Sequence, residues 1–364
     1  MNRPTVLIYL CLFPIATFSG QQSNLLTMTP PLPHCGEIES LPFARSGDTG
    51  PRVCPPVTSR KYVHHNKGLG FDILDSESEA CFVPDQAYRT LDDIIDAVKS
   101  AVKYDSSLTD PPAELDQARM ISATISHELT NGGFGLYIPT DTLGDALVDR
   151  NQPNEPERHE FDCDTGSFIF ITVASNLGAT TALVDIPLPS GNGHNYVQWL
   201  LDKRGTSMNW DTNQQGECRT PEALPAYAGK PMSARQTQGY AISLRAPLWV
   251  SRGLFDRAIA DYHEATQLYS EAPTSFNNFA WMIATKDFPA RQTYVAQALT
   301  SAQHAISITR TGNYMDTLAC VYALLGDFKH ALATESQAIQ LGGNTAFDVR
   351  LAHFHANQNC TGDE

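Results

Sequence analysis

Three residues in the middle of the chain have the types and spacing that nucleophilic catalysis by a cysteine requires. Cys163 stands in FDCDTGSF, His194 in GNGHNYVQW and Asp211 in NWDTN, with spacings of 31 and 17 residues. A thiol becomes a strong nucleophile when a base takes its proton, an imidazole can return that proton to the leaving group, and a carboxylate can orient the imidazole. The sequence therefore predicts Cys163 as the nucleophile, His194 as the acid and base, and Asp211 as the orienting residue.

Cys163 is expected at the start of a helix. Apolar residues recur after it at helical spacing, and Gly178 is a typical C-terminal stop. The stripe comprises Phe170, Val173, Ala174 and Leu177. Backbone N–H groups at a helix start, together with a nearby imidazolium, favour the thiolate over a thiol of ordinary pKa, about 8.5. We therefore expect a reactive thiol, which the flanking carboxylates of Asp162 and Asp164 would oppose unless Asp164 caps the helix.

His194 and Asp211 are expected on neighbouring strands. The segments TTALVDIP, HNYVQWLL and SMNWD have strand-like composition, and a polar turn over 202–205 separates the last two. Trp199 and Trp210 lie in these strands and are expected to pack in the core. Two further helices are predicted, one from Thr90 and one over 114–129. Helices followed by an antiparallel meander indicate an α+β domain.

A cysteine at a helix start, a histidine on one strand and an aspartate on the next resemble the transglutaminase-like branch of the papain-like cysteine hydrolases, over about residues 66–228. The resemblance implies an attack on a peptide or glutamine amide that passes through a thioester, without a cofactor. Transfer to water gives hydrolysis, which we favour, and transfer to a lysine gives cross-linking. The oxyanion site would use the N–H of Cys163 and one upstream side chain that the sequence does not identify, with Asn131 and His159 as guesses.

The last third of the chain is helical and repetitive. Three segments align around small residues with steps of 40 and 33 residues. The second step is close to the tetratricopeptide period of about 34, and the surplus in the first fits a longer loop at KDFPAR. The aligned pairs are Ala258 and Ala265, Ala298 and Ala305, and Ala331 and Ala338. Each segment has a preceding helix, which contributes Ala246, Ala280 or Ala319 to the helix contact. The three pairs, over about 235–341, resemble tetratricopeptide repeats, which bind peptides or proteins on a concave face; a generic helical bundle is the alternative.

The N-terminus predicts export. The apolar segment over 5–18 is too short to span a bilayer, and small residues follow it, so residues 1–20 are expected to be a cleaved signal peptide and the mature protein to be periplasmic or secreted. A Pro-rich extension over 21–65 follows. The remaining domains are the transglutaminase-like domain over 66–228, the tetratricopeptide-like repeats over 229–350 and a tail over 351–364.

Cysteine usage leads to a redox prediction. Seven cysteines remain after signal cleavage, so at least one thiol is unpaired. We expect Cys163 to be free and at least one disulfide to form among the others, with Cys35 to Cys54 as the first choice. Cys320 lies inside a predicted helix and is expected to be a packed small residue.

Charge and histidine spacing exclude other classes. The chain carries 40 acidic and 25 basic residues, a net charge of −15, which argues against binding of nucleic acid or an anionic bilayer. The histidines form no recognised ligand set, since His127 and Glu128 lack a second histidine at metal-binding spacing. We therefore expect no metal, a protein or peptide substrate, a protein partner on the repeats, and no integral membrane segment after signal cleavage.

Other interpretations remain open. Cys163 could be buried or disulfide-bonded, His194 a structural histidine and Asp211 the start of a turn. The rival function is a binding scaffold whose transglutaminase-like domain has lost its activity. If the domain is active, near hydrogen-bond contacts should link Cys163, His194 and Asp211. We also expect that truncation near Tyr227 leaves the thiol reactive, because the repeats lie after the predicted site.

Overall fold

A computed structural model of the protein describes most of the chain after residue 60. The described ranges are 61–102, 115–136, 142–149, 158–187, 193–201, 206–213, 216–217, 227–342 and 345–362. The predicted signal peptide, the Pro-rich segment up to residue 60, the Cys35–Cys54 pair and the predicted turn over 202–205 lie outside the described residues.

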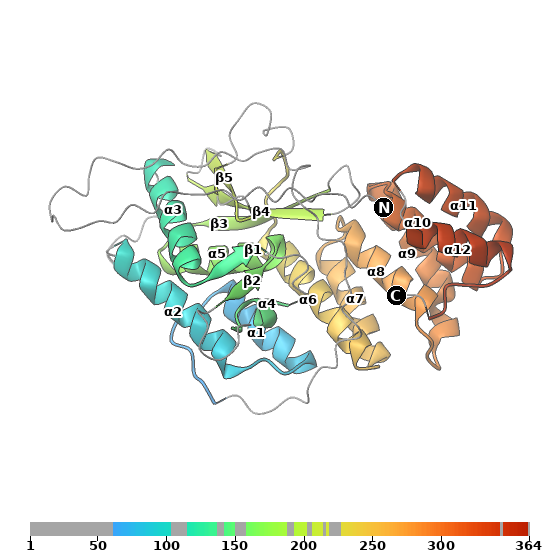
Figure 1. The fold of residues 1–364 in the computed structure, drawn as a ribbon, viewed down its shortest axis with the longest axis horizontal. Coiled ribbons are helices and arrows are strands. Elements are labelled where there is room, and N and C mark those ends of the chain that lie inside the picture. The colour runs from blue at the N-terminus through green and yellow to red at the C-terminus, as the bar shows by residue number, and fades with distance from the viewer. Residues whose placement is uncertain are drawn as a thin grey trace, which may run out of the picture. The chain divides into compact units, whose positions relative to one another are not determined.

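Several helices precede the candidate cysteine (Figure 1). They are α1 (Leu69–Ala80), α2 (Asp85–Ala101), α3 (Leu115–Asn131) and the short α4 (Leu143–Ala146). Helix α2 buries the predicted apolar stripe, including Leu91, Ile95 and Val98. It begins five residues before the predicted start at Thr90, because Pro84 at the N-cap has a backbone angle suited to a helix entry. Helix α1, which buries Phe71 and Leu74, was not predicted.

Helix α5 and two small sheets form the α+β part (Figure 1). The first sheet pairs β1 (Phe134–Leu136) with β2 (His159–Phe161) in parallel. The second is an antiparallel meander of β3 (Thr181–Pro187), β4 (Gly193–Leu200), β5 (Ser207–Asp211) and β6 (Gly216–Glu217). The helix that the cysteine motif predicts is α5 (Cys163–Asn176), and it ends before Gly178, whose φ is 76°. The predicted helix and the three predicted strands are therefore confirmed.

Aromatic packing joins α5 to the meander. The ring of Phe170 lies 6.5 Å from that of Trp199 and 6.1 Å from that of Trp210, between ring centroids. Both tryptophans are buried, which confirms their predicted place in the core. Large aromatic side chains at one contact bury much apolar area, so they fix α5 against β4 and β5.

The C-terminal third consists of packed helices (Figure 1). They are α6 (Ala234–Ser251), α7 (Phe255–Leu268), α8 (Pro273–Thr285), α9 (Val295–Ile308), α10 (Gly312–Leu324), α11 (Phe328–Gln340) and α12 (Thr345–His355), with the 3₁₀ helix η2 (Arg291–Tyr294) before α9. The three predicted helix pairs are present as α6 with α7, α8 with α9, and α10 with α11. All nine aligned alanines are fully buried, because only a small side chain fits where two helix backbones approach closely.

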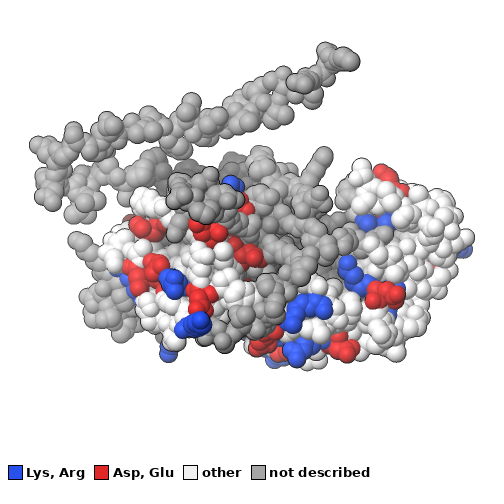
Figure 2. Space-filling view, turned by 60° about the horizontal axis from the view of Figure 1, so that its bottom comes forward, with Lys and Arg blue, Asp and Glu red and all other residues white. Residues whose placement is uncertain are grey.

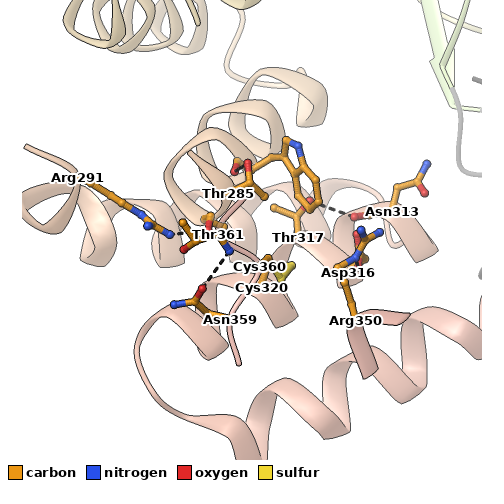
Figure 3. Close-up of a disulfide and its surroundings, with 12 residues drawn as sticks. Thr285, Arg291, Asn313, Asp316, Thr317, Cys320, Arg350, Asn359, Cys360 and Thr361 are labelled. Carbon is orange, nitrogen blue, oxygen red and sulfur yellow. Dashed lines mark hydrogen bonds and ion pairs between the residues drawn. A yellow bond between two sulfur atoms is a disulfide. The ribbon is translucent and has the colours of Figure 1, made fainter. Parts of the chain in front are cut away.

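A disulfide fastens the C-terminal segment to α10. Cys320 is bonded to Cys360 (Figure 3). Two residues after Cys360, the main-chain N–H of Gly362 donates to the carbonyl of Thr285 at 2.8 Å. Cys320 is fully buried, as expected, and it is also disulfide-bonded, because the chain after α12 returns to α10. Helix α12 also crosses residue 350, where the repeats were predicted to end.

Acidic and basic side chains lie close to one another on the face of the molecule drawn in Figure 2. Charges of both signs weaken each other's potential there. Among the described helices, none has the length and apolar character needed to cross a bilayer.

Candidate active site

Cys163 is the first residue of α5, as predicted. The residue that caps the helix is Asp162, whose Oδ1 accepts from the main-chain N–H groups of Asp164 at 3.1 Å and Thr165 at 2.9 Å. The hydroxyl of Thr165 accepts in return from the N–H of Asp162, which completes a capping box. Asp164 is therefore not the cap, and its carboxylate is left to face the thiol.

Gly166 allows this helix start to lie close to its neighbours. A Cβ atom at Gly166 would stand 2.7 Å from the ring of Phe161 and 3.0 Å from the hydroxyl oxygen of Thr212. The first distance is too short for a Cβ atom unless the ring of Phe161 shifts, and the second is tight, so a glycine fits here without displacing its neighbours. The close approach holds the N-terminus of α5 beside β2 and beside the residue that follows Asp211.

The thiol of Cys163 is free and partly buried. It donates to Oδ1 of Asp164 at 3.6 Å, and the main-chain N–H of Asn195 points at the sulfur. Burial raises the pKa of the thiol well above its ordinary value, the charges of Asp164 and Asp162 raise it further, and the N–H of Asn195 lowers it. The expectation of a readily formed thiolate is therefore wrong for this state, because desolvation and two carboxylates outweigh the helix start.

His194 and Asp211 form a hydrogen-bonded pair. Nε2 of His194 lies 2.7 Å from Oδ2 of Asp211, and the exposed fractions of the two side chains are 2% and 0%. The pairing of Val197 with Trp210 brings the two residues to the same side of the meander. Oδ2 also accepts the hydroxyl of Tyr227, and Oδ1 accepts the main-chain N–H of Asn213 at 2.8 Å. Since the carboxylate only accepts, Nε2 carries the proton and Nδ1 is left to act as a base.

The thiol of Cys163 lies near the end of β4 that carries His194. The sulfur of Cys163 contacts the main chain at Asn195, the residue after His194. Successive side chains of a strand point to opposite sides, so Asn195 faces Asp164 while His194 faces Asp211. Of the predicted chain of contacts, the hydrogen bond between His194 and Asp211 is formed. The thiol of Cys163 is instead hydrogen-bonded to Asp164 and to the main chain of Asn195. Catalytic hydrogen bonds are often loose before substrate binds.

Sequence reasoning missed two residues of this site. The side-chain amide of Asn195 donates to Oδ1 of Asp164, and it also donates to the hydroxyl of Tyr240 at 2.7 Å. That hydroxyl in turn donates to Oδ1 of Asp164 at 2.8 Å. We call these three residues the Asp164 cluster. The adjacency of Asn195 to His194 was a signal for the first residue, but nothing local pointed to Tyr240, which lies 76 positions after Asp164.

Two acidic side chains near the thiol have raised pKa values. Burial raises the pKa of Asp164 to about 7, and the charge of Asp162 adds to this effect. Burial also raises the pKa of Asp185 to about 6, an effect that His194 opposes. Asp185 is paired with Asn195 across β3 and β4. Near neutral pH the site therefore holds carboxyl groups that are partly protonated.

The guesses for the oxyanion side chain gain no support. Asn131 is exposed at the end of α3, and its amide lies 3.0 Å from Nε2 of His127. His159 is buried in β2, with its ring 4.4 Å from that of Phe134. The second oxyanion donor therefore stays unassigned.

Comparisons of the chain with models of known protein families, with curated proteins and with solved structures give no match. What the fold defines is an α+β unit followed by a helical array, and its candidate site holds a free cysteine next to a buried histidine–aspartate pair.

Proposed function

We propose that this chain is an exported cysteine-dependent hydrolase or acyltransferase that acts on peptide or glutamine amide bonds. The observation that carries the proposal is the buried pair of His194 and Asp211. The next residue of the strand, Asn195, directs its main-chain N–H at the thiol of Cys163. Burying a histidine together with an aspartate costs free energy, because both polar side chains lose their water. Such a pair beside a free cysteine at a helix start is typical of a nucleophile and its base.

The reaction follows from the roles of these groups. Nδ1 of His194 takes the proton of the thiol, and the sulfur attacks the amide carbonyl. The tetrahedral oxyanion faces the main-chain N–H of Cys163 at the start of α5. His194 then gives its proton to the leaving amine, and a thioester remains. Water, or an amine in the transferase case, releases the acyl group and restores the thiol.

The resting thiol is protonated, so proton transfer belongs to the encounter with substrate. Burial and the carboxylate of Asp164 both disfavour a lone thiolate. A thiolate paired with the imidazolium of His194 is disfavoured less, because the positive charge compensates. Asp211 stabilises that imidazolium through Oδ2. The resemblance to the transglutaminase-like cysteine hydrolases and a papain-like fold are part of this proposal.

A second candidate is a protein-binding scaffold without catalysis, with tetratricopeptide-type repeats as the binding surface. The contact of Asp164 with the thiol favours it, because this contact keeps the sulfur protonated and occupied. The two candidates differ in whether the reactivity of Cys163 depends on His194.

Export is also a proposal. It is supported by the disulfide between Cys320 and Cys360, because disulfides persist mainly in oxidising compartments. Fractionation of cells that express the full chain, with intact-mass analysis of the mature N-terminus, tests it. An exported chain that begins near residue 21 is the expected result, and an uncleaved chain in the cytosol would contradict it.

Alkylation of Cys163 by iodoacetamide, followed by mass spectrometry of the native protein, tests the catalytic proposal. We expect that His194→Ala slows alkylation near neutral pH at least tenfold, whereas His263→Ala, a substitution in α7, leaves the rate unchanged. Denatured casein serves as the probe substrate, with ammonia release and new N-termini as the two readouts. Equal alkylation of the wild type and His194→Ala, with no product from casein, would favour the scaffold.

A further inference from the structure

A tyrosine of the helical array reaches the candidate site. Tyr240 lies in α6, the first helix of the array, and its side chain is buried with its hydroxyl among Asp164 and Asn195. Its ring centroid lies 6.3 Å from that of Phe168, one turn after the start of α5. The sequence-based division of labour, in which the repeats lie apart from the site, therefore does not hold for α6.

We infer that Tyr240 is a positioning residue, whose hydroxyl holds the carboxylate of Asp164 against the thiol of Cys163 and so sets the reactivity of that thiol. The inference rests on the proposed role of Cys163 as the reacting group. Oδ1 of Asp164 is the common acceptor, since it receives the thiol, the amide of Asn195 and the hydroxyl of Tyr240.

The direction of the effect follows from the donors. A hydrogen bond from Tyr240 favours the charged form of Asp164 and lowers the pKa of that carboxyl group, against the effect of burial. The charged carboxylate in turn raises the pKa of the thiol. Burial keeps the pKa of Tyr240 itself well above its ordinary value, so the hydroxyl remains a neutral donor throughout the range in which Asp164 titrates.

The other groups around Asp164 come from three further places in the fold. Asp162 precedes it at the N-cap of α5, Asp185 faces it from β3, and Asn195 binds it from β4. Asp211 of β5 adds a smaller effect on the thiol. None of these side chains replaces the hydroxyl of Tyr240, because Asp162, Asp185 and Asp211 are acidic and Asn195 already donates to the same oxygen.

The test is the pH dependence of Cys163 alkylation by iodoacetamide in the full chain, from pH 6 to pH 10. Without the hydroxyl of Tyr240, Asp164 holds its proton to higher pH and opposes the thiolate less. We expect that Tyr240→Phe speeds alkylation several-fold between about pH 7 and pH 8, where the variant keeps more of Asp164 protonated than the wild type does. At pH 10, where Asp164 is charged in both proteins, the two rates should be the same. Tyr262→Phe, at a buried tyrosine of α7, is the matched control and should follow the wild type.

Two further variants separate positioning from loosening of the fold. Asp164→Asn should speed alkylation at least as much between about pH 7 and pH 8, and Tyr240→Phe should add nothing to it in the double variant. An equal change in rate at every pH, pH 10 included, would show that Tyr240 only limits access to the thiol, and the inference would then be wrong. It would also be wrong if the effects of the two substitutions multiplied.

These outcomes are independent of the test of the proposed function. If His194→Ala leaves alkylation unchanged while Tyr240→Phe speeds it between about pH 7 and pH 8, the catalytic proposal fails and the role of Tyr240 stands. If His194→Ala slows alkylation while Tyr240→Phe follows the control, the reverse holds.

Discussion

Tyr227 donates its hydroxyl to Oδ2 of Asp211, the same oxygen atom that accepts Nε2 of His194. Tyr227 follows the meander in sequence, and its ring lies edge-on to that of His194, with 6.3 Å between the ring centroids. The tyrosine therefore helps to fix both partners of the buried pair, through one hydrogen bond and one ring contact.

Removal of this hydroxyl should destabilise the protein. Tyr227→Phe takes one donor from a buried carboxylate, and a hydrogen bond to a charged group contributes about 1.5–3 kcal/mol. We expect a loss of about 2 kcal/mol in the free energy of unfolding, measured by urea denaturation. Tyr262→Phe should cost less, since the described residues give its hydroxyl no hydrogen-bond partner. An equal loss in the two variants would show that the hydrogen bond to Asp211 adds nothing to the free energy of unfolding.

Stability should fall as the pH rises through the acidic range. The pKa of Asp185 is raised to about 6 and that of Asp164 to about 7, whereas an unfolded aspartate titrates near 3.9. The folded state therefore binds more protons than the unfolded state between these values. The stability that these groups contribute is complete below pH ~4 and is lost by pH ~7.

Asp185→Asn tests this sign. The substitution removes the titration, so the drop in Tm between pH 5 and pH 8 should be smaller than in the wild type. Thermal unfolding at one-unit pH steps measures the drop. Asp256→Asn, at an exposed position of α7, is the control and should keep the wild-type pH dependence. Parallel curves for the wild type and Asp185→Asn would contradict the prediction.

The disulfide should carry much of the stability of the last helices. Cys320 and Cys360 close a loop of about 40 residues, for which chain entropy predicts about 4 kcal/mol. We expect Cys320→Ala with Cys360→Ala to lower the free energy of unfolding by up to this amount. Peptide mapping without reduction should recover the linked peptides from the wild type. Recovery of Cys320 as a free thiol would refute the bridge.

An ion pair between α6 and α7 should stabilise the first two helices of the array. Arg245 donates to both oxygens of Asp261, at 2.8 and 2.7 Å, and the indole N–H of Trp249 donates to Oδ2 at 2.8 Å. Arg245→Met leaves the buried carboxylate without its cation, which should cost about 3 kcal/mol in urea denaturation. Arg235→Met, at an exposed position of α6, should change the free energy of unfolding by less than about 0.5 kcal/mol. Similar losses in both variants would argue against the pair.

Local pattern in the sequence was sufficient for several elements of this protein, though not for α1, and for the order of its candidate residues. Apolar spacing predicted α5, strand-like composition predicted β3, β4 and β5, and the repeated alanines predicted the helix pairs of the array. These signals are local, because a helix or a strand buries one face at a fixed period. The pairing of His194 with Asp211 also followed, since adjacent antiparallel strands bring such positions together.

Only the tertiary structure determined the protonation of the Cys163 thiol and the residues that influence its pKa. Tyr240 reaches Asp164 only because α6 packs against the α+β part, where Arg245 of the same helix also binds Glu79 of α1. Cys320 and Cys360 are bonded although two helices, α11 and α12, separate them in the sequence. Contacts between residues so far apart in sequence depend on how the elements pack, and so does the burial that raises the pKa of Cys163. No period or spacing in the sequence predicts these long-range contacts or this burial.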